Sequence, residues 1–143
     1  MEARRSSKAL SPRRPAAAPS VPAGPEKAAL ALGRSGEDIA CRYLLEKKYE
    51  ILERGFRLLR GEIDIVALDG ETLVFVEVKA RTDESHGRPE EAVTPGKQRQ
   101  LRRLAQGYLV SHPRPGADCR FDVIAILFRG PDDCRLEHFI DAF

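Results

Sequence analysis

The sequence of 143 residues has few of the residues that build disulfide scaffolds and thiolate metal sites, since it contains only three cysteines. Cys41, Cys119 and Cys134 are odd in number, widely spaced and without a C-x-x-C pair, so they indicate neither a zinc site nor a disulfide framework. Unpaired cysteines are typical of a reducing compartment, and we therefore expect a cytoplasmic protein.

Histidine and long apolar segments are also scarce. The three histidines are scattered, without the H-E-x-x-H spacing that places two imidazoles on one helix face. No apolar run approaches the ~18 residues of a membrane-spanning helix. The sequence thus predicts no histidine metal site and no membrane partner.

Charge and proline are unevenly distributed along the chain. The formal net charge is +2, yet residues 1–27 hold six basic and two acidic residues, five of the ten prolines and no aromatic residue. Such a segment cannot bury enough apolar surface to offset the entropy of ordering it. We therefore expect a disordered, basic, Pro/Ala-rich tail over residues 1–32 and one folded domain over residues 33–143.

Hydrophobic periodicity predicts two helices and five strands in this domain. Ser35 fits the N-cap position of the first helix, because Asp38 follows three residues later. Asp69-Gly70 is the strongest short-range signal for a β-hairpin, and Pro95 suits the first turn of the second helix. In chain order we expect a helix over 35–47, strands over 50–56, 62–68 and 72–79, a helix from 95, and strands over 121–128 and 136–140.

The order of these elements predicts the topology. A single helix between the third and fourth strands favours a crossover that leaves those two strands parallel, whereas the other connections are antiparallel. The expected fold class is α/β, with a mixed central β-sheet flanked by helices.

Two strands carry charges that a purely structural strand would not keep. Glu77 and Lys79 project to one face of the largely apolar strand over 72–79. Asp64 lies across the hairpin, near the position opposite Glu77. Two carboxylates held close together repel each other and raise the pKa of at least one of them, and a bound divalent cation would remove this repulsion.

Mg²⁺, or Mn²⁺ in its place, suits such a pair, because it takes one or two carboxylates and keeps water and phosphate oxygens as its other ligands. Lys79 would stabilise charge that develops on a phosphate. Glu37, early in the first helix, is a third candidate acid. The predicted metal ligands are therefore Asp64, Glu77 and Glu37, and the predicted chemistry is phosphodiester hydrolysis.

Five strings of the sequence closely resemble the YraN family, small bacterial proteins of largely uncharacterised role. They are GRSGE at 33–37, GEIDIV at 61–66, LVFVEVKAR at 73–81, AVTPGKQ at 92–98 and RFDVIAI at 120–126. The resemblance covers residues 33–143. The family is similar to the restriction-endonuclease-like nucleases, whose signature is an Asp followed across a hairpin by Glu-x-Lys, and to archaeal Holliday junction resolvases.

This resemblance implies a restriction-endonuclease-like fold and a Mg²⁺-dependent endonuclease that acts on branched or structured DNA. It makes Glu37, Asp64, Glu77 and Lys79 the metal and catalytic set. Junction-cutting relatives are often dimers, so a homodimer is one expected assembly. The Gln-x-x-x-Tyr pattern of the related exonucleases is missing from the second helix, which favours an endonuclease.

Basic and amide side chains at the start of the second helix are candidates for binding the nucleic-acid backbone. They are Lys97, Gln98, Arg99, Arg102 and Arg103. Two other charged residues have structural interpretations instead. Asp122 fits a hydrogen-bonded acid within an apolar strand, and Glu62 fits an ion pair with an arginine.

Two other functions fit the same residues. One is a non-catalytic nucleic-acid-binding or adaptor protein that retains the nuclease fold, and it predicts salt-dependent DNA binding without metal-dependent cleavage. The other is a protein-interaction module in which the charged site is structural, and it predicts no affinity for nucleic acid.

Overall fold

The computed structural model describes residues 25–82, 93–130 and 132–143. Residues 1–24 of the expected tail and most of the segment between the third strand and the second helix lie outside these ranges. The described elements, in chain order, are α1 (Pro25–Glu46), β1 (Glu50–Leu58), β2 (Gly61–Asp69), β3 (Thr72–Arg81), α2 (Pro95–Ser111), β4 (Cys119–Gly130) and β5 (Asp133–Phe139). This order of helices and strands confirms the prediction.

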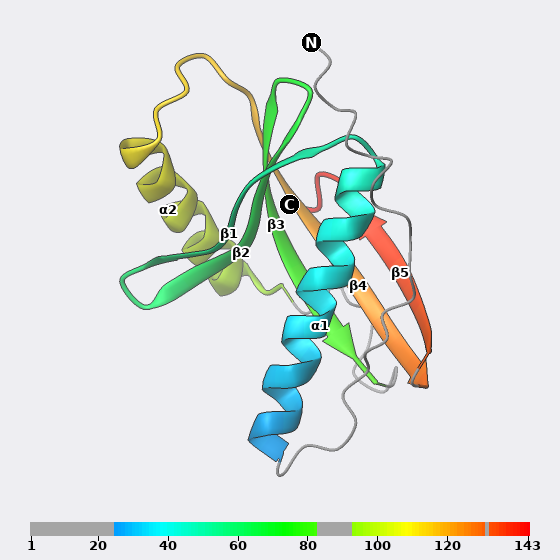
Figure 1. Ribbon diagram of the computed structural model, residues 1–143. Helices are drawn as coiled ribbons and strands as arrows, with labels where there is room; N and C mark the ends of the chain where they lie inside the picture. Colours follow the sequence, from blue (N-terminus) through cyan, green and yellow to red (C-terminus); the bar gives the residue numbers. More distant parts are fainter. Residues whose placement is uncertain (1–24, 83–92, 131) are drawn as a thin grey trace.

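The five strands form one sheet in the order β1-β2-β3-β4-β5 (Figure 1). Strands β3 and β4 are parallel, with Phe75 beside Phe121, and the other neighbouring strands are antiparallel. The α2 crossover thus joins parallel neighbours as predicted, and the sheet is mixed. The Asp69-Gly70 turn closes the β2–β3 hairpin, with Gly70 at a φ of 65° that suits glycine.

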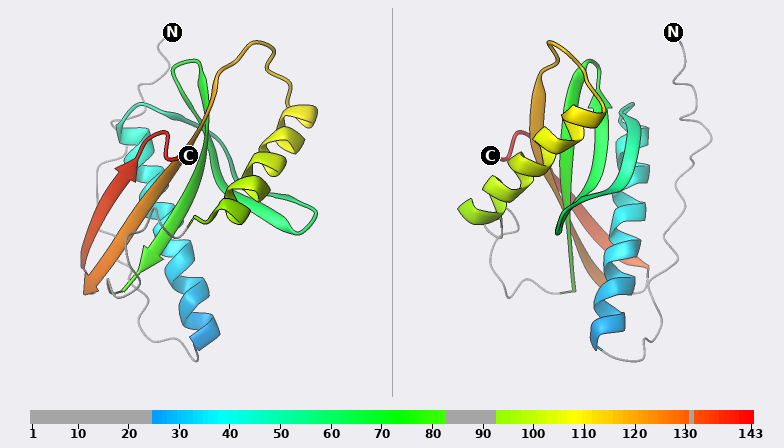
Figure 2. Two further views of the ribbon diagram at one scale, coloured as in Figure 1. Left: turned by 180° about the vertical axis from the view of Figure 1, so that it is seen from behind. Right: turned by 90° about the vertical axis from the view of Figure 1, so that its left-hand side faces the viewer.

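The two helices cover opposite faces of the sheet, as the two views of Figure 2 show. Strand alternation divides β3 between them, because successive side chains point to opposite faces. Val74 and Val76 pack in the hydrophobic cluster that includes α1. Leu73 and Phe75 pack in the cluster that includes α2. Even-numbered and odd-numbered residues of β3 therefore belong to different layers of the core.

Helix α1 begins ten residues before the predicted N-cap. It starts at Pro25, so Ser35 lies inside the helix and its assignment as the N-cap was wrong. Residues 25–32, which we expected to be part of the tail, are helical. The physical reason is visible in the sequence: proline is favoured at a first helical position, and the Glu, Lys, Ala and Leu residues that follow Pro25 are strong helix formers.

Helix α2 begins where its sequence predicted. Thr94 is the N-cap, and its hydroxyl accepts a hydrogen bond from the Lys97 backbone N–H at 3.2 Å. Pro95 occupies the first turn, and the helix ends before Pro113. The apolar stripe of Leu101, Leu104, Ala105 and Tyr108 is buried against the sheet.

A buried polar network connects the strands at the end of the sheet that carries the β2–β3 turn. The carboxylate of Asp122, 0% exposed, accepts hydrogen bonds from Arg120, His138 and the Asp141 backbone N–H. Arg120 also donates to Asp69 and to the Tyr49 hydroxyl. Burial raises the pKa of Asp122, but these hydrogen bonds outweigh burial and leave that pKa lowered. Asp122 is thus a hydrogen-bonded structural acid, as expected.

Two further expectations concern cysteines and membranes. Cys41, Cys119 and Cys134 are all free thiols. No helix in the described part of the chain is long and apolar enough to cross a membrane.

Candidate metal centre

Strands β2 and β3 stop pairing at Asp64. Their ladder ends at the pair of Ile65 and Val76, while β3 continues beside β4 as far as Arg81. Asp64 Oδ2 accepts a hydrogen bond of 2.8 Å from the backbone N–H of Val78. The Asp64 side chain therefore lies where the two strands separate, and it pairs with a β3 amide beyond the end of the β2–β3 ladder.

Three carboxylates gather at this separation. Glu37 of α1 and Glu62 and Asp64 of β2 each offer an oxygen, and the three oxygens lie within 4.8 Å of one another. All three residues are half-buried. Carboxylate oxygens are the ligands that Mg²⁺ and Ca²⁺ prefer, so these residues could hold a divalent metal ion. We call them the acidic cluster.

A close contact between α1 and β3 brings Glu37 to the acidic cluster. A Cβ atom built on Gly36 would lie 3.0 Å from Ala80 Cβ, 3.6 Å from Val78 Cγ1 and 3.8 Å from Ile126 Cδ1. Only a residue without a side chain lets the helix approach the strand this closely. Glu37, the next residue, is thereby held at the edge of the α1 layer.

A glycine in β1 leaves room for the acidic cluster on its other side. Gly55 has a φ of 68°, a left-handed conformation that favours glycine. It stands between the paired residues Arg54 and Phe56, whose β2 partners are Ile65 and Ile63. A Cβ atom on Gly55 would lie 3.1 Å from Glu62 Oε2, so a larger residue there would press on the Glu62 carboxylate.

Glu77 lies among lysines. Its carboxylate is buried, with the residue only 7% exposed, and Oε2 is 3.5 Å from Lys79 Nζ and 3.7 Å from Lys97 Nζ. Lys97 belongs to the first turn of α2, whereas Glu77 and Lys79 share one face of β3. The resulting group of one acid and two ammonium groups adjoins the acidic cluster through Asp64, because Glu77 is the charged neighbour that most raises the pKa of Asp64.

Burial, together with the crowding of like charges, raises two pKa values in this region. Burial, followed by the negative charge of Glu77, raises the pKa of Asp64 from 3.8 to about 7, and Glu37 and Glu62 add to the shift. Burial and the charge of Glu62 also raise the pKa of Glu37, although Arg54 and a hydrogen bond with Asp64 partly offset this. A divalent cation would neutralise the repulsion that adds to burial in both shifts.

Arginines hold the outer carboxylates in place. Arg54 Nη2 lies 2.8 Å from Asp38 Oδ1 and 3.8 Å from Glu37 Oε1. Arg57 Nη2 lies 3.4 Å from Glu62 Oε1, which confirms the predicted pairing of Glu62 with an arginine. Glu37 and Glu62 thus each lie near an arginine, whereas the charged neighbours of Asp64 are the acids Glu37, Glu62 and Glu77.

The structure brings together part of the predicted metal set and adds one residue to it. Glu37 and Asp64 are in the acidic cluster, whereas Glu77 lies outside that group, beside Lys79. Glu62 takes the third position in the acidic cluster, which sequence reasoning missed. Its position two residues before Asp64 was the available signal, since residues i and i+2 of a strand share a face.

The predicted nucleic-acid-binding residues of α2 separate into different environments. Lys97 lies beside Glu77, and the Gln98 side-chain amide donates to the Val93 carbonyl at 3.1 Å. The Arg102 guanidinium stacks over the rings of Phe121 and Phe143, 5.0 and 5.5 Å from their centroids. Arg99 and Arg103 are exposed on the outer surface of the helix.

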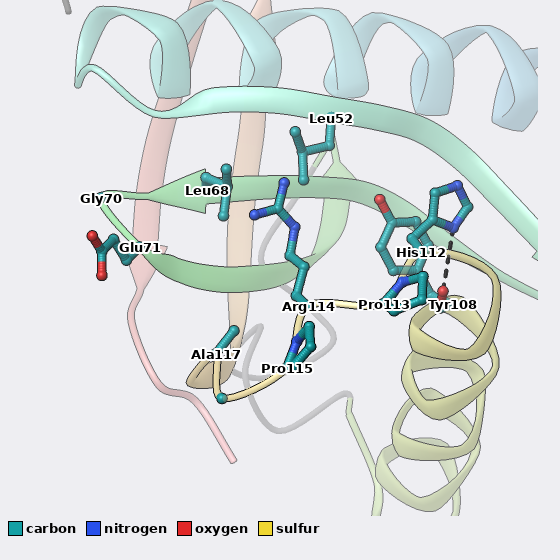
Figure 3. A pocket seen from close by; sticks show the side chains of 11 residues that line it. Leu52, Leu68, Gly70, Glu71, Tyr108, His112, Pro113, Arg114, Pro115 and Ala117 are labelled. Atoms are coloured by element: carbon teal, nitrogen blue, oxygen red, sulfur yellow. Dashed lines mark hydrogen bonds between the residues drawn. The ribbon is translucent and has the colours of Figure 1, made fainter.

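A separate pocket lies at the other end of α2, near the β2–β3 turn. Figure 3 shows Arg114 reaching from the loop after α2 toward Leu52 and Leu68, with the rings of Tyr108 and His112 at the right-hand side of the pocket. The His112 ring stacks on Tyr108, with centroids 4.2 Å apart and planes 7° from parallel. This pocket uses the end of β2 opposite to Asp64 and shares no residue with the acidic cluster.

Comparison with known proteins gives one consistent family. The profile of the Uncharacterised protein family UPF0102 matches residues 36–126. A UPF0102 protein of Chlorobium phaeobacteroides (strain BS1) is 51% identical over 117 residues, which cover 78% of this chain and 93% of that protein. A UPF0102 protein of Geobacter sulfurreducens is 50% identical over 112 residues, which cover 78% and 88% of the two chains.

Proposed function

Because the chain belongs to the UPF0102 family, also called the YraN family, and carries this acidic cluster beside a lysine-flanked glutamate, we propose that it is a metal-dependent nuclease. In this proposal it is an endonuclease that hydrolyses phosphodiester bonds in branched or structured DNA. The single observation that carries the proposal is the position of Asp64, between Glu37 and Glu62 on one side and Glu77 with its lysines on the other. The order of Asp64, hairpin, Glu77 and Lys79 also fits the signature of restriction-endonuclease-like nucleases.

The donor set fits Mg²⁺ or Mn²⁺. The available atoms are carboxylate oxygens, which hard divalent cations prefer, and no cysteine or histidine belongs to the acidic cluster. Burial and the nearby charge of Glu77 both raise the pKa of Asp64, and a cation would relieve the repulsive part of this effect. Glu37, Glu62 and Asp64 would hold the ion, and Glu77 lies next to them. A bound ion would supply Lewis acidity toward a phosphate and would lower the pKa of a bound water.

The lysines give the site its affinity for the substrate and for the transition state. Lys79 and Lys97 present two ammonium groups beside Glu77, and a phosphate that entered here would meet both. Lys97 stands in the first turn of α2, where the helix dipole also favours an anion. Fixed positive groups of this kind stabilise the charge that develops on phosphate oxygens as the bond to the leaving oxygen breaks.

The test is a cleavage assay with the full chain on a four-way DNA junction and on a linear duplex of the same sequence. Cleavage should need Mg²⁺ or Mn²⁺ and should be lost in Glu77→Gln, Lys79→Met and Asp64→Asn. Glu71→Gln and Lys47→Met are matched controls, because Glu71 is exposed at the β2–β3 turn, at the end of β2 opposite to Asp64, and Lys47 is exposed just after the end of α1. Cleavage that survives the three site variants would show that these residues are not the catalytic set.

The assay also separates the proposed nuclease from a non-catalytic relative. Salt-dependent binding of DNA by a protein that cuts neither substrate with either metal would identify a binding or adaptor protein. A readout that does not depend on activity comes from thermal unfolding. Millimolar MgCl₂ should raise the Tm of the wild type and should leave the Tm of Asp64→Asn nearly unchanged.

A further inference from the structure

The β1–β2 hairpin extends beyond the body of the sheet as a two-stranded ribbon. Pairing of β2 with β3 ends at Ile65, whereas pairing of β2 with β1 continues to Leu58 and Gly61. Figures 1 and 2 show this ribbon projecting past the sheet alongside α2. The acidic cluster runs along this ribbon: Asp64 lies at its base, next to the last β2–β3 pair at Ile65, and Glu62 pairs with Arg57 beside the tip.

The tip of the ribbon carries leucines in place of the usual turn residues. Leu58 packs against α2, where its side chain occupies the space beside Gly107. Leu59 is 90% exposed and has a φ of 55°. A turn with positive φ normally uses Gly, Asn or Asp. Leucine is therefore unfavourable for the backbone at position 59, and its exposed side chain does not contribute to the hydrophobic core. A ligand that covers this side chain would remove its apolar surface from water.

Exposed arginines surround the tip. Arg57 and Arg60 flank the two leucines in the chain, and Arg103 lies one helical turn from Gly107 on α2. Arg57 also bridges the tip to the acidic cluster through Glu62, at 3.4 Å. An exposed leucine surrounded by arginines fits a ligand that carries both negative charge and apolar surface. Nucleic acid is such a ligand, because it combines charged phosphates with bases that stack.

We propose that Leu59 is a wedge that inserts beside unstacked bases at a branch point or nick in DNA, while Arg57, Arg60 and Arg103 contact the flanking phosphates. This inference rests on the proposed nuclease function and specifies its substrate. Apolar side chains that enter a base step must unstack it. At a branch point the bases are already partly unstacked, so the wedge would favour branched over linear DNA.

The ribbon also sets a distance between the wedge and the site of cleavage. Leu59 is five residues from Asp64, and because it lies in the turn between β1 and β2 the separation is at most about 16 Å at ~3.3 Å per residue. Duplex DNA rises ~3.4 Å per base pair. The scissile phosphate should therefore lie within about five base pairs of the branch point.

The test uses Leu59→Asn, because asparagine tolerates a positive φ and removes the apolar surface without disturbing the fold. Ile140→Asn is the matched control. Ile140 is 57% exposed and directly follows β5, the edge strand opposite to β1 in the sheet. Four-way junctions carry 2-aminopurine at the branch point, and binding is measured in EDTA so that no cleavage occurs. Circular dichroism and Tm confirm folding of each variant.

The wild type and Ile140→Asn should raise the 2-aminopurine fluorescence at least twofold, and Leu59→Asn should abolish the rise. Leu59→Asn should also lose tenfold or more of the preference for junction over linear duplex, with linear binding changed less than twofold. An unchanged fluorescence response and preference would overturn the wedge while leaving cleavage, and thus the nuclease proposal, intact.

Other outcomes distinguish the two proposals further. A Leu59-dependent fluorescence response in a protein that never cuts DNA would support the wedge and overturn the nuclease. Absence of DNA binding would overturn both. Self-association that Leu59→Asn abolishes in sedimentation, with DNA binding unchanged, would assign the tip to a second copy of the chain and overturn the wedge.

Discussion

The carboxylate of Asp64 accepts the backbone N–H of Val78 at 2.8 Å, at the point where β2 leaves β3. This single bond places a carboxylate between two strands that have stopped pairing. The same carboxylate has two acidic neighbours in the acidic cluster and a third in Glu77. The separation of the strands and the gathering of charge are therefore one structural feature, and most predictions concern it.

The first prediction concerns stability against pH without metal. The pKa of Asp64 is about 7 in the folded protein, against 3.8 ordinarily. Between these values the folded state binds more protons than the unfolded state, so the free energy of unfolding should fall as pH rises from 5 to 8. Asp64→Asn should remove most of this fall, although the raised pKa of Glu37 leaves a smaller one. The variant should be more stable than the wild type at pH 8 by at least about 1 kcal/mol, since one pKa unit corresponds to ~1.4 kcal/mol.

Urea unfolding in EDTA at pH 5, 6, 7 and 8 measures this effect. Asparagine keeps an oxygen that can accept the Val78 N–H, so the variant isolates the charge. Glu137→Gln, on the exposed part of β5, serves as the control and should keep the wild-type slope. Equal slopes for the wild type and Asp64→Asn would show that Asp64 is not the titrating group.

The second prediction separates the two lysines beside Glu77. Lys79→Met should lower kcat about 100-fold, the typical loss when one fixed charge-stabilising group is removed. Lys97→Met should act mainly on DNA binding and should reduce the slope of log K against log salt by about one, as expected for one lost phosphate contact. Single-turnover cleavage and salt titrations measure the two effects. A pure binding defect in Lys79→Met would contradict its assigned role.

The third prediction concerns the contact of α1 with β3. Gly36→Val places a branched side chain against Ala80 Cβ, which lies 3.0 Å from where even a Cβ would stand. We expect a loss of about 1–3 kcal/mol in the free energy of unfolding, the usual cost of overpacking. Displacement of Glu37 should also reduce the rise in Tm caused by MgCl₂.

A second substitution makes this prediction specific. Ala80→Gly removes the atom that the new side chain meets, so the double variant should recover part of both losses. A double-mutant cycle with no coupling between positions 36 and 80 would show that the contact does not place Glu37.

The fourth prediction concerns the buried network at the opposite end of the sheet. Asp122→Ala leaves the Arg120 guanidinium without its main charge partner and should cost about 3–5 kcal/mol of stability, as for other broken buried pairs. Asp133→Ala, at the exposed start of β5, should cost little. Metal-dependent cleavage per folded molecule should not change, and a selective loss of cleavage in a stable Asp122→Ala protein would contradict a structural role.

The fifth prediction concerns the basic segment before α1. Residues 1–24 contain five basic residues and one acidic residue. Deleting them should lower the salt dependence of DNA binding, by at most about four in the slope of log K, and should leave Mg²⁺-dependent cleavage intact. The deletion stops at residue 24 because α1 begins at Pro25. Loss of cleavage in the deletion variant would assign the segment a role in catalysis.

The sheet was predictable because its signals are local. The Asp69-Gly70 turn, the alternation in β3 and the apolar run in β4 each specify their own element, and the helix between β3 and β4 specifies a parallel pair. The start of α1 was not predicted because proline and alanine suggested disorder before Ser35, whereas Pro25 also satisfies the first position of a helix. The composition of residues 1–32 is an average over that segment, and such an average does not reveal that a helix starts at Pro25.

The candidate site was predicted in part for a similar reason. Asp64, Glu77 and Lys79 follow from strand alternation across one hairpin, which sequence positions specify. Glu62 shares a face of β2 with Asp64, which the sequence indicates, but its closeness to Glu37 depends on how α1 packs on the sheet, which the sequence does not specify. The hydrogen bond between His138 of β5 and Asp122 of β4 depends on the pairing of two strands and on the rotamers of both side chains. The sequence indicated only that an acid stands within an apolar strand.

The Asp122 network and the acidic cluster occupy opposite ends of β2, and their positions have a mechanical consequence. At one end Arg120 clamps Asp69 and Tyr49 to β4. At the other end β2 has left β3 and follows β1 alone. The β2–β3 hairpin is therefore fastened at its turn by the side chain of Arg120 and, where the strands separate, by the hydrogen bond between Asp64 and the Val78 N–H. Because both ends are fastened, the spacing of Asp64 and Glu77 depends on a contact as far away as the turn, and a change at Arg120 can alter the charged site without touching it.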